Sequence, residues 1–475
     1  MSREGVQRWL FFALRWGIAV LGIGYVVWNL NLRDHVWVLD EATSRPVVAT
    51  VVGSPPEDTW PLRVVLPDGS EREVQRSEVL IRPDRRFVEL AADGQRVTVL
   101  ALDVLPGATL PRRVLVAGGR AEPGRWVEVQ ALKGGYPDLV AFPAREIGLL
   151  RMVREAETLY LVLAVAVIPG IYLLTGYRWW LLLRGLEVPL TLGRAIQINL
   201  VGAFYNTFMP GQTGGDLLKA YYAAKSATRH RTRAVLSVII DRAIGLLALI
   251  ILGGACAALQ WHVPQCRQVA VAAGVILLLV AAGLVLVGSG RVRSALGVAW
   301  VLGKLPMQEK VQKVWGAMSL YKRRPMLMAG TLLLSFPVHG TIVVSATFAG
   351  WAFALPLEWT YYWVLVPTVV LAGALPISPQ GAGVMEFFAI LLTRPQGATV
   401  GQAFALTMSI RLVQIVWNLL AGVLVLAGGY HAPTEKEQAE LETANDDLPA
   451  GGAGMVAAAG EAAVRTQAGH GGRAG

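Results

Sequence analysis

Apolar residues dominate this chain in runs that are long enough to cross a membrane, and polar segments separate the runs. A helix needs roughly 20 predominantly apolar residues to span the hydrocarbon core of a bilayer. The pattern therefore predicts a polytopic α-helical membrane protein. Five stretches are predicted to be complete spanning helices: residues 158–182, 234–259, 268–288, 326–354 and 401–428.

The first 32 residues predict a separate membrane anchor. Three arginines precede an apolar run from Trp16 to Trp28, which is the order of charged and apolar residues in a signal peptide. No small-residue cleavage site follows the run. We therefore expect residues 1–32 to be an uncleaved anchor whose N-terminus lies in the cytoplasm.

Residues 33–152 show a different pattern, in which apolar and polar residues alternate with a period of two. Arg96–Leu100 and Trp126–Val129 are examples, and turn signals such as Asp93-Gly94 separate the segments. Such alternation predicts strands, so we expect a small all-β extracytoplasmic domain, a barrel or a sandwich. His35 stands alone in the sequence and the carboxylates are scattered, which indicates a packing module or a docking site for an extracytoplasmic protein partner.

Two apolar stretches are broken in the middle, and the arms of the first are too short to span. Residues 195–224 are broken at Pro210, and residues 360–393 are broken between Pro376 and Gly383. Basic residues flank the first stretch on both sides and mark cytoplasmic loops, so this stretch is predicted to be a re-entrant hairpin. By analogy, the second is predicted to be a hairpin that enters from the outer side. Its flanking charges leave a full span open as the alternative.

The predicted elements recur in the same order. A span, a hairpin and a span cover residues 158–259, one connecting helix follows, and the same three elements cover residues 326–428. A single connecting helix inverts the second unit relative to the first, which is the inverted-repeat plan of many transporters. The interval from Asp216 to Asp241 also equals the interval from Glu386 to Arg411.

The composition supports a membrane protein and explains the positive net charge of the chain. Charged residues make up 16% of the 475 residues and hydrophobic residues 54%, whereas soluble domains average about 25% charged residues. The net charge of +10 would favour nucleic acid in a soluble protein. Here the basic residues gather in short connections, as in cytoplasmic loops, so we expect a multi-pass protein of the bacterial inner membrane and no nucleic-acid partner. The clusters are Arg178, Arg184 and Arg194, then Lys225, Arg229, Arg231 and Arg233, and then the basic residues from Arg291 to Arg324.

The sequence contains no pattern that is typical of a metal or cofactor site. Cys256 and Cys266 lack metal-binding spacing, and no GxxxxGK[ST] nucleotide-binding segment occurs. We therefore expect no metal, no cofactor and no catalytic residues. Any energy for transport would come from a gradient or a partner, or the transport would be passive.

The break in the first hairpin carries the first group of candidate binding residues. Pro210 ends a helix, glycines let the chain turn, and the next helix would present free N–H groups that attract anions. The functional interpretation is a site for a phosphate-bearing lipid headgroup. The alternative is an interfacial turn in which Asp216 caps the helix. The candidate residues are Asn206, Pro210, Gln212, Gly214, Gly215, Asp216 and Lys219.

The break in the second hairpin follows the same logic and is followed by one carboxylate. An ionisable residue at membrane depth is costly unless it is paired or functional, and Arg411 in the last span is the expected partner of Glu386. A purely structural pair is the alternative. The candidate residues are Ser378, Gln380, Gly381, Gly383, Glu386 and Arg411.

Asp241 and Arg242, on the predicted helix that begins near residue 234, complete the candidate site. The functional interpretation places both on a polar path for lipid. In the alternative, Arg242 extends to the cytoplasmic face and Asp241 neutralises it.

These motifs resemble the lysylphosphatidylglycerol synthase transmembrane-region family, also called flippase-like, over about residues 155–428. The resemblance implies a role in lipid handling. In bifunctional members this region moves an aminoacylated phospholipid between leaflets, and a C-terminal soluble domain makes that lipid. The residues that carry the resemblance are Pro210, Gly211, Gly214, Gly215 and Asp216, then Asp241, Arg242 and Gly245, and then Pro376, Ser378, Pro379, Gly381, Gly383 and Glu386.

Residues 431–475 are acidic and then rich in Ala and Gly, a composition that cannot bury a core. We expect a disordered cytoplasmic tail there and no synthase domain. The predicted division of the chain is therefore an anchor (1–32), an all-β domain (33–152), a flippase-like transmembrane domain (153–430) and a tail (431–475).

The sequence thus predicts a lipid flippase or transporter-like protein that moves an anionic or isoprenoid-linked lipid across the inner membrane. The lipid is the expected partner. Two other classes remain open: a membrane-embedded transferase, or an accessory subunit for one, in lipid-linked glycan synthesis, and a scaffold whose β domain recruits a protein.

Overall fold

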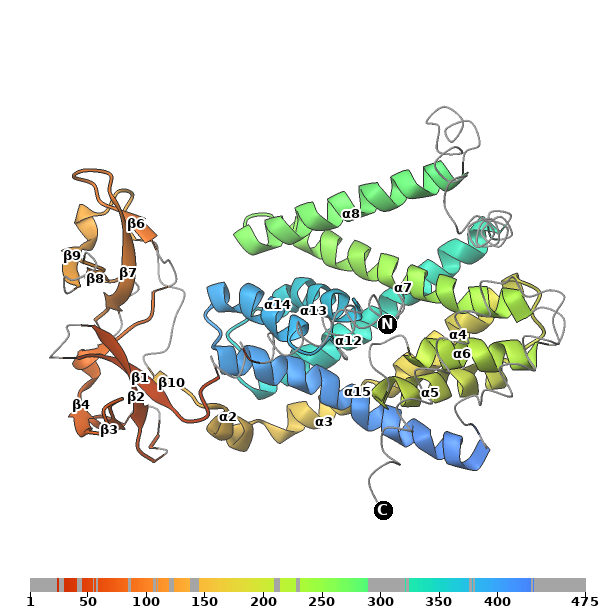
Figure 1. Cartoon of the computed structure of the whole chain (residues 1–475), viewed down its shortest axis with the longest axis horizontal. Helices are drawn as coiled ribbons and strands as arrows, with labels where there is room; N and C mark the ends of the chain where they lie inside the picture. The colour runs from red at the N-terminus through yellow and green to blue at the C-terminus, as the bar shows by residue number, and fades with distance from the viewer. Residues whose placement is uncertain are drawn as a thin grey trace, which may run out of the picture.

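The computed structural model describes residues 24, 30–40, 45–53, 55–56, 59–83, 87–105, 108, 110–118, 124–136, 145–208, 214–227, 231–288, 321, 324–375, 378, 381–428 and 430. Most of the predicted anchor and all of the predicted tail lie outside these residues. The described chain is mostly helical, with a β-rich region before the helices (Figure 1).

Strands form where the sequence alternates with a period of two, and they build two antiparallel sheets. Val36 and Val64 are buried in the first sheet, Val97 and Val114 in the second, and Leu115 belongs to a small cluster that also includes residues of both sheets. The first sheet has the order β10-β1-β2-β3-β4 with β5 also on β1, and the second has the order β6-β7-β8-β9. The strands are β1 (His35–Leu39), β2 (Pro46–Val51), β3 (Leu62–Val65), β4 (Glu71–Val74), β5 (Val79–Leu80), β6 (Phe87–Glu89), β7 (Arg96–Asp103), β8 (Arg113–Val116), β9 (Arg125–Glu128) and β10 (Arg145–Glu146).

One buried carboxylate ties the start of the β-rich region to the start of the helices. Asp34 accepts hydrogen bonds from the Gly148 backbone N–H (2.8 Å) and from Arg151 Nη1 (3.0 Å), and it also pairs with Arg145. Burial alone would raise the pKa of Asp34, but the Gly148 N–H and the two guanidinium groups outweigh it, so this pKa lies below its usual value. His35 has no nearby partner in the sequence, but its Nε2 lies 3.1 Å from Glu146 Oε2 on the neighbouring strand, where β1 pairs with β10.

The Asp34 contacts should make the junction sensitive to acid. A carboxyl group whose pKa is depressed by folding stabilises the folded state at neutral pH, and that contribution is lost as the pH falls through the folded pKa, below about pH 4. We expect Asp34→Asn to loosen the junction already at pH 7, so that proteolysis of the β-rich region speeds up. Asp68→Asn, in an exposed turn, is the control, and an equal effect of both changes would contradict the prediction.

Among the residues that the structure describes, five helical stretches are long and apolar enough to cross a membrane. They are Thr158–Gly185, Arg233–Leu259, Pro264–Val285, Pro325–Ala352 and Val400–Gly428, which confirms the five predicted spans. The helices are α2 (Leu149–Glu155), α3 (Thr158–Ala166), α4 (Pro169–Gly185), α5 (Leu192–Phe208), α6 (Gly214–Ser226), α7 (Arg231–Leu259), α8 (Pro264–Gly288), α12 (Pro325–Ala352), α13 (Trp359–Ala374), α14 (Val384–Thr393) and α15 (Val400–Gly428).

Helices α5 and α6 run antiparallel and approach each other closely through glycine. The Gly215 N–H donates to Asn206 Oδ1 (2.7 Å), and further along the pair Lys219 Nζ donates to Asn199 Oδ1 (3.1 Å). A Cβ on Gly215 would overlap the carbonyl oxygen of Gly202, so only glycine permits this distance between the backbones.

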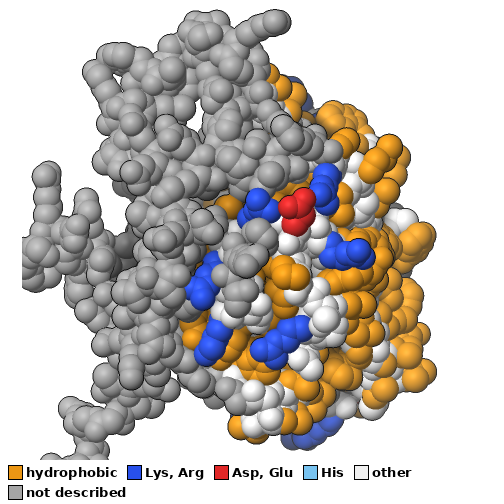
Figure 2. Space-filling model, turned by 90° about the vertical axis from the view of Figure 1, so that its right-hand side faces the viewer, with side chains coloured by type: hydrophobic (Ala, Val, Ile, Leu, Met, Phe, Trp, Pro, Cys, Tyr) orange, Lys and Arg blue, Asp and Glu red, His pale blue; other side chains and the backbone are white. Residues whose placement is uncertain are grey.

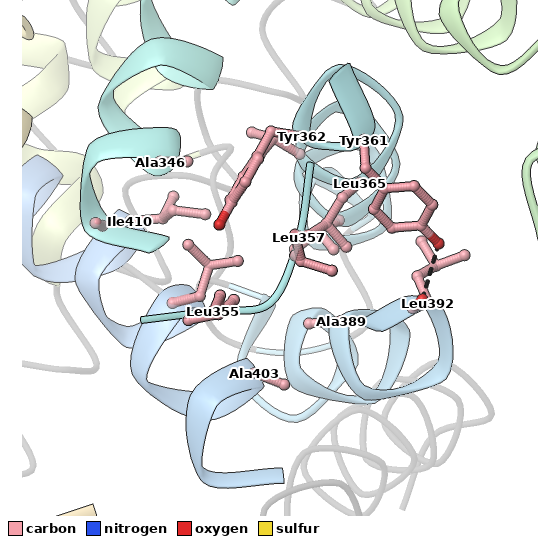
Figure 3. Close-up of a cluster of buried hydrophobic side chains, with 14 of the residues drawn as sticks. Ala346, Leu355, Leu357, Tyr361, Tyr362, Leu365, Ala389, Leu392, Ala403 and Ile410 are labelled. Carbon is pink, nitrogen blue, oxygen red and sulfur yellow. Dashed lines mark hydrogen bonds between the residues drawn. The ribbon is translucent and has the colours of Figure 1, made fainter. Parts of the chain in front are cut away.

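Helices α13 and α14 form a second antiparallel pair. The Tyr361 hydroxyl at the start of α13 donates to the Leu392 carbonyl near the end of α14 (2.8 Å), as the dashed line in Figure 3 marks. Gly381 and Gly383, just before α14, have φ of +71° and +81°, a conformation that is strained for other residues. Figure 3 also shows Leu355, Leu357 and Leu365 in the apolar cluster around this pair.

The two helix pairs have their open ends at opposite ends of α7. Near the start of α7, Arg233 donates to the carbonyl of Leu186 (3.3 Å), which lies between α4 and α5. Just beyond the end of α7, Gln260 Nε2 donates to the Thr360 carbonyl (3.0 Å) at the start of α13. The other ends of the two pairs come together part-way along the bundle, where Asn206 and Asp216 of the first pair and Val370 and Met385 of the second line one cavity.

Lys and Arg side chains gather on the end of the bundle where α7 begins (Figure 2). Glu187 pairs there with Arg233 (3.3 Å) and Arg324 (3.1 Å), which brings the starts of α7 and α12 together. This is the distribution expected for a cytoplasmic face.

Candidate functional site

A cavity of about 290 Å³ lies where the tips of the two helix pairs meet. Apolar side chains from α4, α12, α13 and α15 form much of its wall, and polar side chains are set among them. The polar lining consists of Tyr172, Asn206, Asp216, Arg242, Arg411, Gln414 and Asn418. Such a space offers a ligand both apolar contact and charge.

The first ion pair of the cavity joins α6 to α7. Asp216, in the first turn of α6, accepts a hydrogen bond from Arg242 Nη1. The other terminal nitrogen of Arg242 lies 3.4 Å from the carbonyl oxygen of Ala374, the last residue of α13. Arg242 therefore contacts both helix pairs, and it lines the cavity rather than extending to the basic end of the bundle.

The second ion pair joins α14 to α15. Arg411 Nη2 donates to Glu386 Oε1 (2.8 Å), which confirms the pairing expected from the sequence. Glu386 Oε2 accepts from the Gly383 N–H (2.7 Å), so both carboxylate oxygens are occupied. Arg411 Nε is buried without a hydrogen-bond partner in the described part of the chain.

A third charged group lies outside the cavity lining. Asp241 accepts from Arg178 Nε (2.8 Å) and from Lys219 Nζ (3.0 Å), and Arg178 also donates to Ser335 Oγ (2.7 Å). Arg178, Lys219 and Asp241 are each about 95% buried. We call these three residues the buried triad.

The buried triad corrects three interpretations of the sequence. Asp241 does not neutralise Arg242, because its two oxygens face Arg178 and Lys219. Arg178 is not part of a cytoplasmic loop, since it lies buried inside the bundle on α4. Lys219 also points to Asp241 rather than into the cavity.

Sequence reasoning missed three polar residues of the cavity. Gln414 and Asn418 follow Arg411 by three and seven positions, which puts all three on one face of α15. That spacing in an otherwise apolar helix was a readable signal. Tyr172, whose hydroxyl donates to Asn418 Oδ1 (2.7 Å), gave no such signal.

The remaining predicted residues are only partly described. Gly214 begins α6 and Gly381 precedes α14. Ser378 is 1% exposed, and its hydroxyl has no hydrogen-bond partner among the residues that the structure describes. Pro210, Gln212 and Gln380 lie outside those residues.

Comparison with known proteins shows to which family this helical bundle belongs. Residues 147–422 match the family described as "Lysylphosphatidylglycerol synthase TM region", which is more than half of the chain. The chain belongs to this family. It is also similar to the UPF0104 membrane protein PH1989 of Pyrococcus horikoshii, with 21% identity over 300 residues that cover 58% of this chain and 89% of the relative.

The lysylphosphatidylglycerol synthase TM region match begins directly after β10 and contains every residue of the cavity lining. The two sheets therefore lie outside the family match. Within the described residues of this family member, no group of three or more His, Cys, Asp or Glu side chains could hold a metal ion.

Because α5 and α6 approach each other so closely in this family member, we expect its activity to be strongly sensitive to replacement of Gly215 by a larger residue. We expect Gly215→Val to abolish the lipid movement that is proposed below, because the new side chain would push α6 away from Gly202 and distort the wall of the cavity. Gly193→Val is the control on α5, since a Cβ there meets nothing within 4 Å. Lipid movement in vesicles is the measurement, and full activity of Gly215→Val would show that the helices need not approach this closely.

Proposed function

We propose that this membrane protein moves an anionic or isoprenoid-linked lipid between the two leaflets of the bacterial inner membrane. The observation that carries the proposal is the cavity inside a bundle of apolar helices, which Asp216, Arg242 and Arg411 line and in which each arginine is paired with a carboxylate, Arg242 with Asp216 and Arg411 with Glu386. Ionisable residues at membrane depth are rare and mark substrate paths. In the proposal the lipid headgroup occupies the cavity while the acyl chains remain in the bilayer.

The proposal treats α5/α6 and α13/α14 as re-entrant hairpins of an inverted repeat. Each pair is followed by a long helix, and the first turn of its second helix carries a carboxylate that pairs with an arginine of that long helix. The pairs are Asp216 with Arg242 and Glu386 with Arg411. The open ends of the two hairpins lie at opposite ends of α7, which supports binding at broken helices near the midplane, as in transporters of this plan.

Movement of labelled lipid in vesicles tests the proposal. We expect the purified protein to speed the exchange of an acyl-labelled phosphatidylglycerol between leaflets, and Arg242→Gln to slow this exchange at least about tenfold, since a charge-assisted hydrogen bond contributes about 1.5–3 kcal/mol. Arg233→Gln is the matched control, because Arg233 lies on the same helix but at its exposed end.

Two outcomes would contradict the proposal. Exchange that is no faster than in empty vesicles, for both phosphatidylglycerol and a polyprenyl phosphate, would remove lipid movement as the function. Formation of a new product from a lipid-linked sugar in the same vesicles would favour the transferase alternative.

A further inference from the structure

The carboxylates near the cavity differ in the number of hydrogen bonds that they accept and in how far their side chains are exposed. Asp241 uses both oxygens, one for Arg178 and one for Lys219, and Glu386 uses both oxygens, one for Arg411 and one for the Gly383 N–H. Asp216 bonds to Arg242 through Oδ2, and Oδ1 has no hydrogen-bond partner among the described residues. The side chain of Asp216 is 30% exposed, whereas that of Glu386 is 3% exposed. Asp216 is therefore the carboxylate that can exchange its partner.

Asp216 is surrounded by charges that keep the cavity close to neutral. On its own helix the nearest charge is Lys219, and α7 contributes Arg242 and Asp241. Helix α4 contributes Arg178, which pairs with the same Asp241 and leaves the buried triad with one excess positive charge, and Tyr172, which lines the cavity. From α15, Arg411 lines the same cavity, and Glu386 of α14 neutralises it. The nearby polar groups of α5 and α13 are the uncharged Asn206 and the Ala374 carbonyl.

An anionic headgroup that enters this cavity would add a negative charge beside the carboxylate of Asp216. Its phosphate would compete with Asp216 for Arg242, and two anions would then share one guanidinium group. An unpaired charge at membrane depth is costly, and two close anions favour the protonation of one of them. Uptake of one proton by Asp216 restores neutrality, because Arg242 is then balanced by the phosphate alone.

We propose that Asp216 is the proton-binding residue of the transport cycle, and that an anionic lipid headgroup and one proton occupy the cavity together. The inference rests on the proposed lipid movement and names its energy source. A proton from solution binds the Asp216 carboxylate as the phosphate replaces that carboxylate at Arg242. Release on the other side reverses both steps, and the Asp216–Arg242 pair forms again. In this cycle the Asp216–Arg242 ion pair is present when no lipid is bound.

The coupling predicts that a proton gradient sets the distribution of the lipid. The protein is placed in phosphatidylcholine vesicles that contain a small fraction of an acyl-labelled phosphatidylglycerol, with the membrane potential clamped and the pH different on the two sides. Labelled lipid should accumulate in the leaflet on the alkaline side. With one proton per lipid and a difference of two pH units, the limiting ratio between the leaflets is about 100-fold, and we expect at least a several-fold excess.

Variants separate the coupling from the movement itself. Asp216→Asn mimics the protonated side chain, so labelled lipid should still exchange but reach equal amounts in both leaflets at any pH difference. Asp216→Glu restores a carboxylate and should restore the accumulation. Glu187→Gln, which also replaces a carboxylate by an amide but lies at the basic end of the bundle, should behave as wild type. Labelled phosphatidylcholine should reach equal amounts in both leaflets whatever the pH difference.

The outcomes also separate this inference from the proposed function. If wild type exchanges phosphatidylglycerol but its final distribution ignores the pH difference, the proton coupling is wrong and lipid movement stands. If Asp216→Asn still accumulates lipid on the alkaline side, the proton binds elsewhere. If wild type exchanges no lipid, both proposals fail.

Discussion

Replacing both Glu386 and Arg411 should give a protein that folds and inserts but does not move lipid. In Glu386→Gln with Arg411→Met no charge is left stranded, and the glutamine oxygen can still accept the hydrogen bond from the Gly383 N–H. Replacement of both members of a buried ion pair by uncharged residues is often nearly neutral for stability. Under the proposed function, the double variant should nevertheless lose lipid movement, because Arg411 is one of the two arginines that line the cavity.

The two single changes should behave differently from the double change. Each leaves one buried charge without its partner, which costs about 3–5 kcal/mol. Thermal stability in detergent and lipid movement in vesicles are measured for wild type, both singles and the double. A double variant that regains both stability and transport would make the pair purely structural and remove it from the lipid path.

Asp241→Asn should destabilise the protein far more than Lys219→Met. The buried triad holds two cations and one carboxylate, so removal of Asp241 leaves two buried positive charges without compensation. That change should cost about 3–5 kcal/mol or more. Removal of Lys219 leaves a neutral pair of Arg178 and Asp241, and the methionine fills a similar volume, so we expect a loss of roughly 1 kcal/mol.

Thermal unfolding in the same detergent compares the two variants. The double variant Asp241→Asn with Lys219→Met is the informative control, because it removes one of the two stranded cations and should recover part of the stability. Equal losses for Asp241→Asn and Lys219→Met would mean that the buried triad is not balanced as the contacts indicate.

Much of the helical framework could be predicted because its signals are local. A spanning helix needs a run of apolar residues, and the five runs were visible as such. The interruptions before α6 and α14 were visible because Pro and Gly mark breaks in a helix. The pairing of Glu386 with Arg411 was predictable too, because few charged residues in these spans could serve as its partner.

Other parts of the site depended on how the helices pack. Asp241 and Arg242 are adjacent in sequence, but successive residues of an α-helix point about 100° apart, so each meets a different neighbour. Arg242 reaches Asp216 of α6 at the cavity, while Asp241 reaches Arg178 of α4 and Lys219 of α6. No local pattern could show which helices would lie there.

The same distinction holds across the whole molecule. The sequence determined by itself which segments are helix, strand or break, because the period and length of apolar runs are properties of neighbouring residues. The division of the strands into two sheets, the meeting of the two helix pairs at the cavity, and the greater exposure of Asp216 than of Glu386 were decided only by the tertiary structure. Each of these depends on contacts between segments far apart in the chain, and the burial and charge that act on a side chain arise only when those segments pack together.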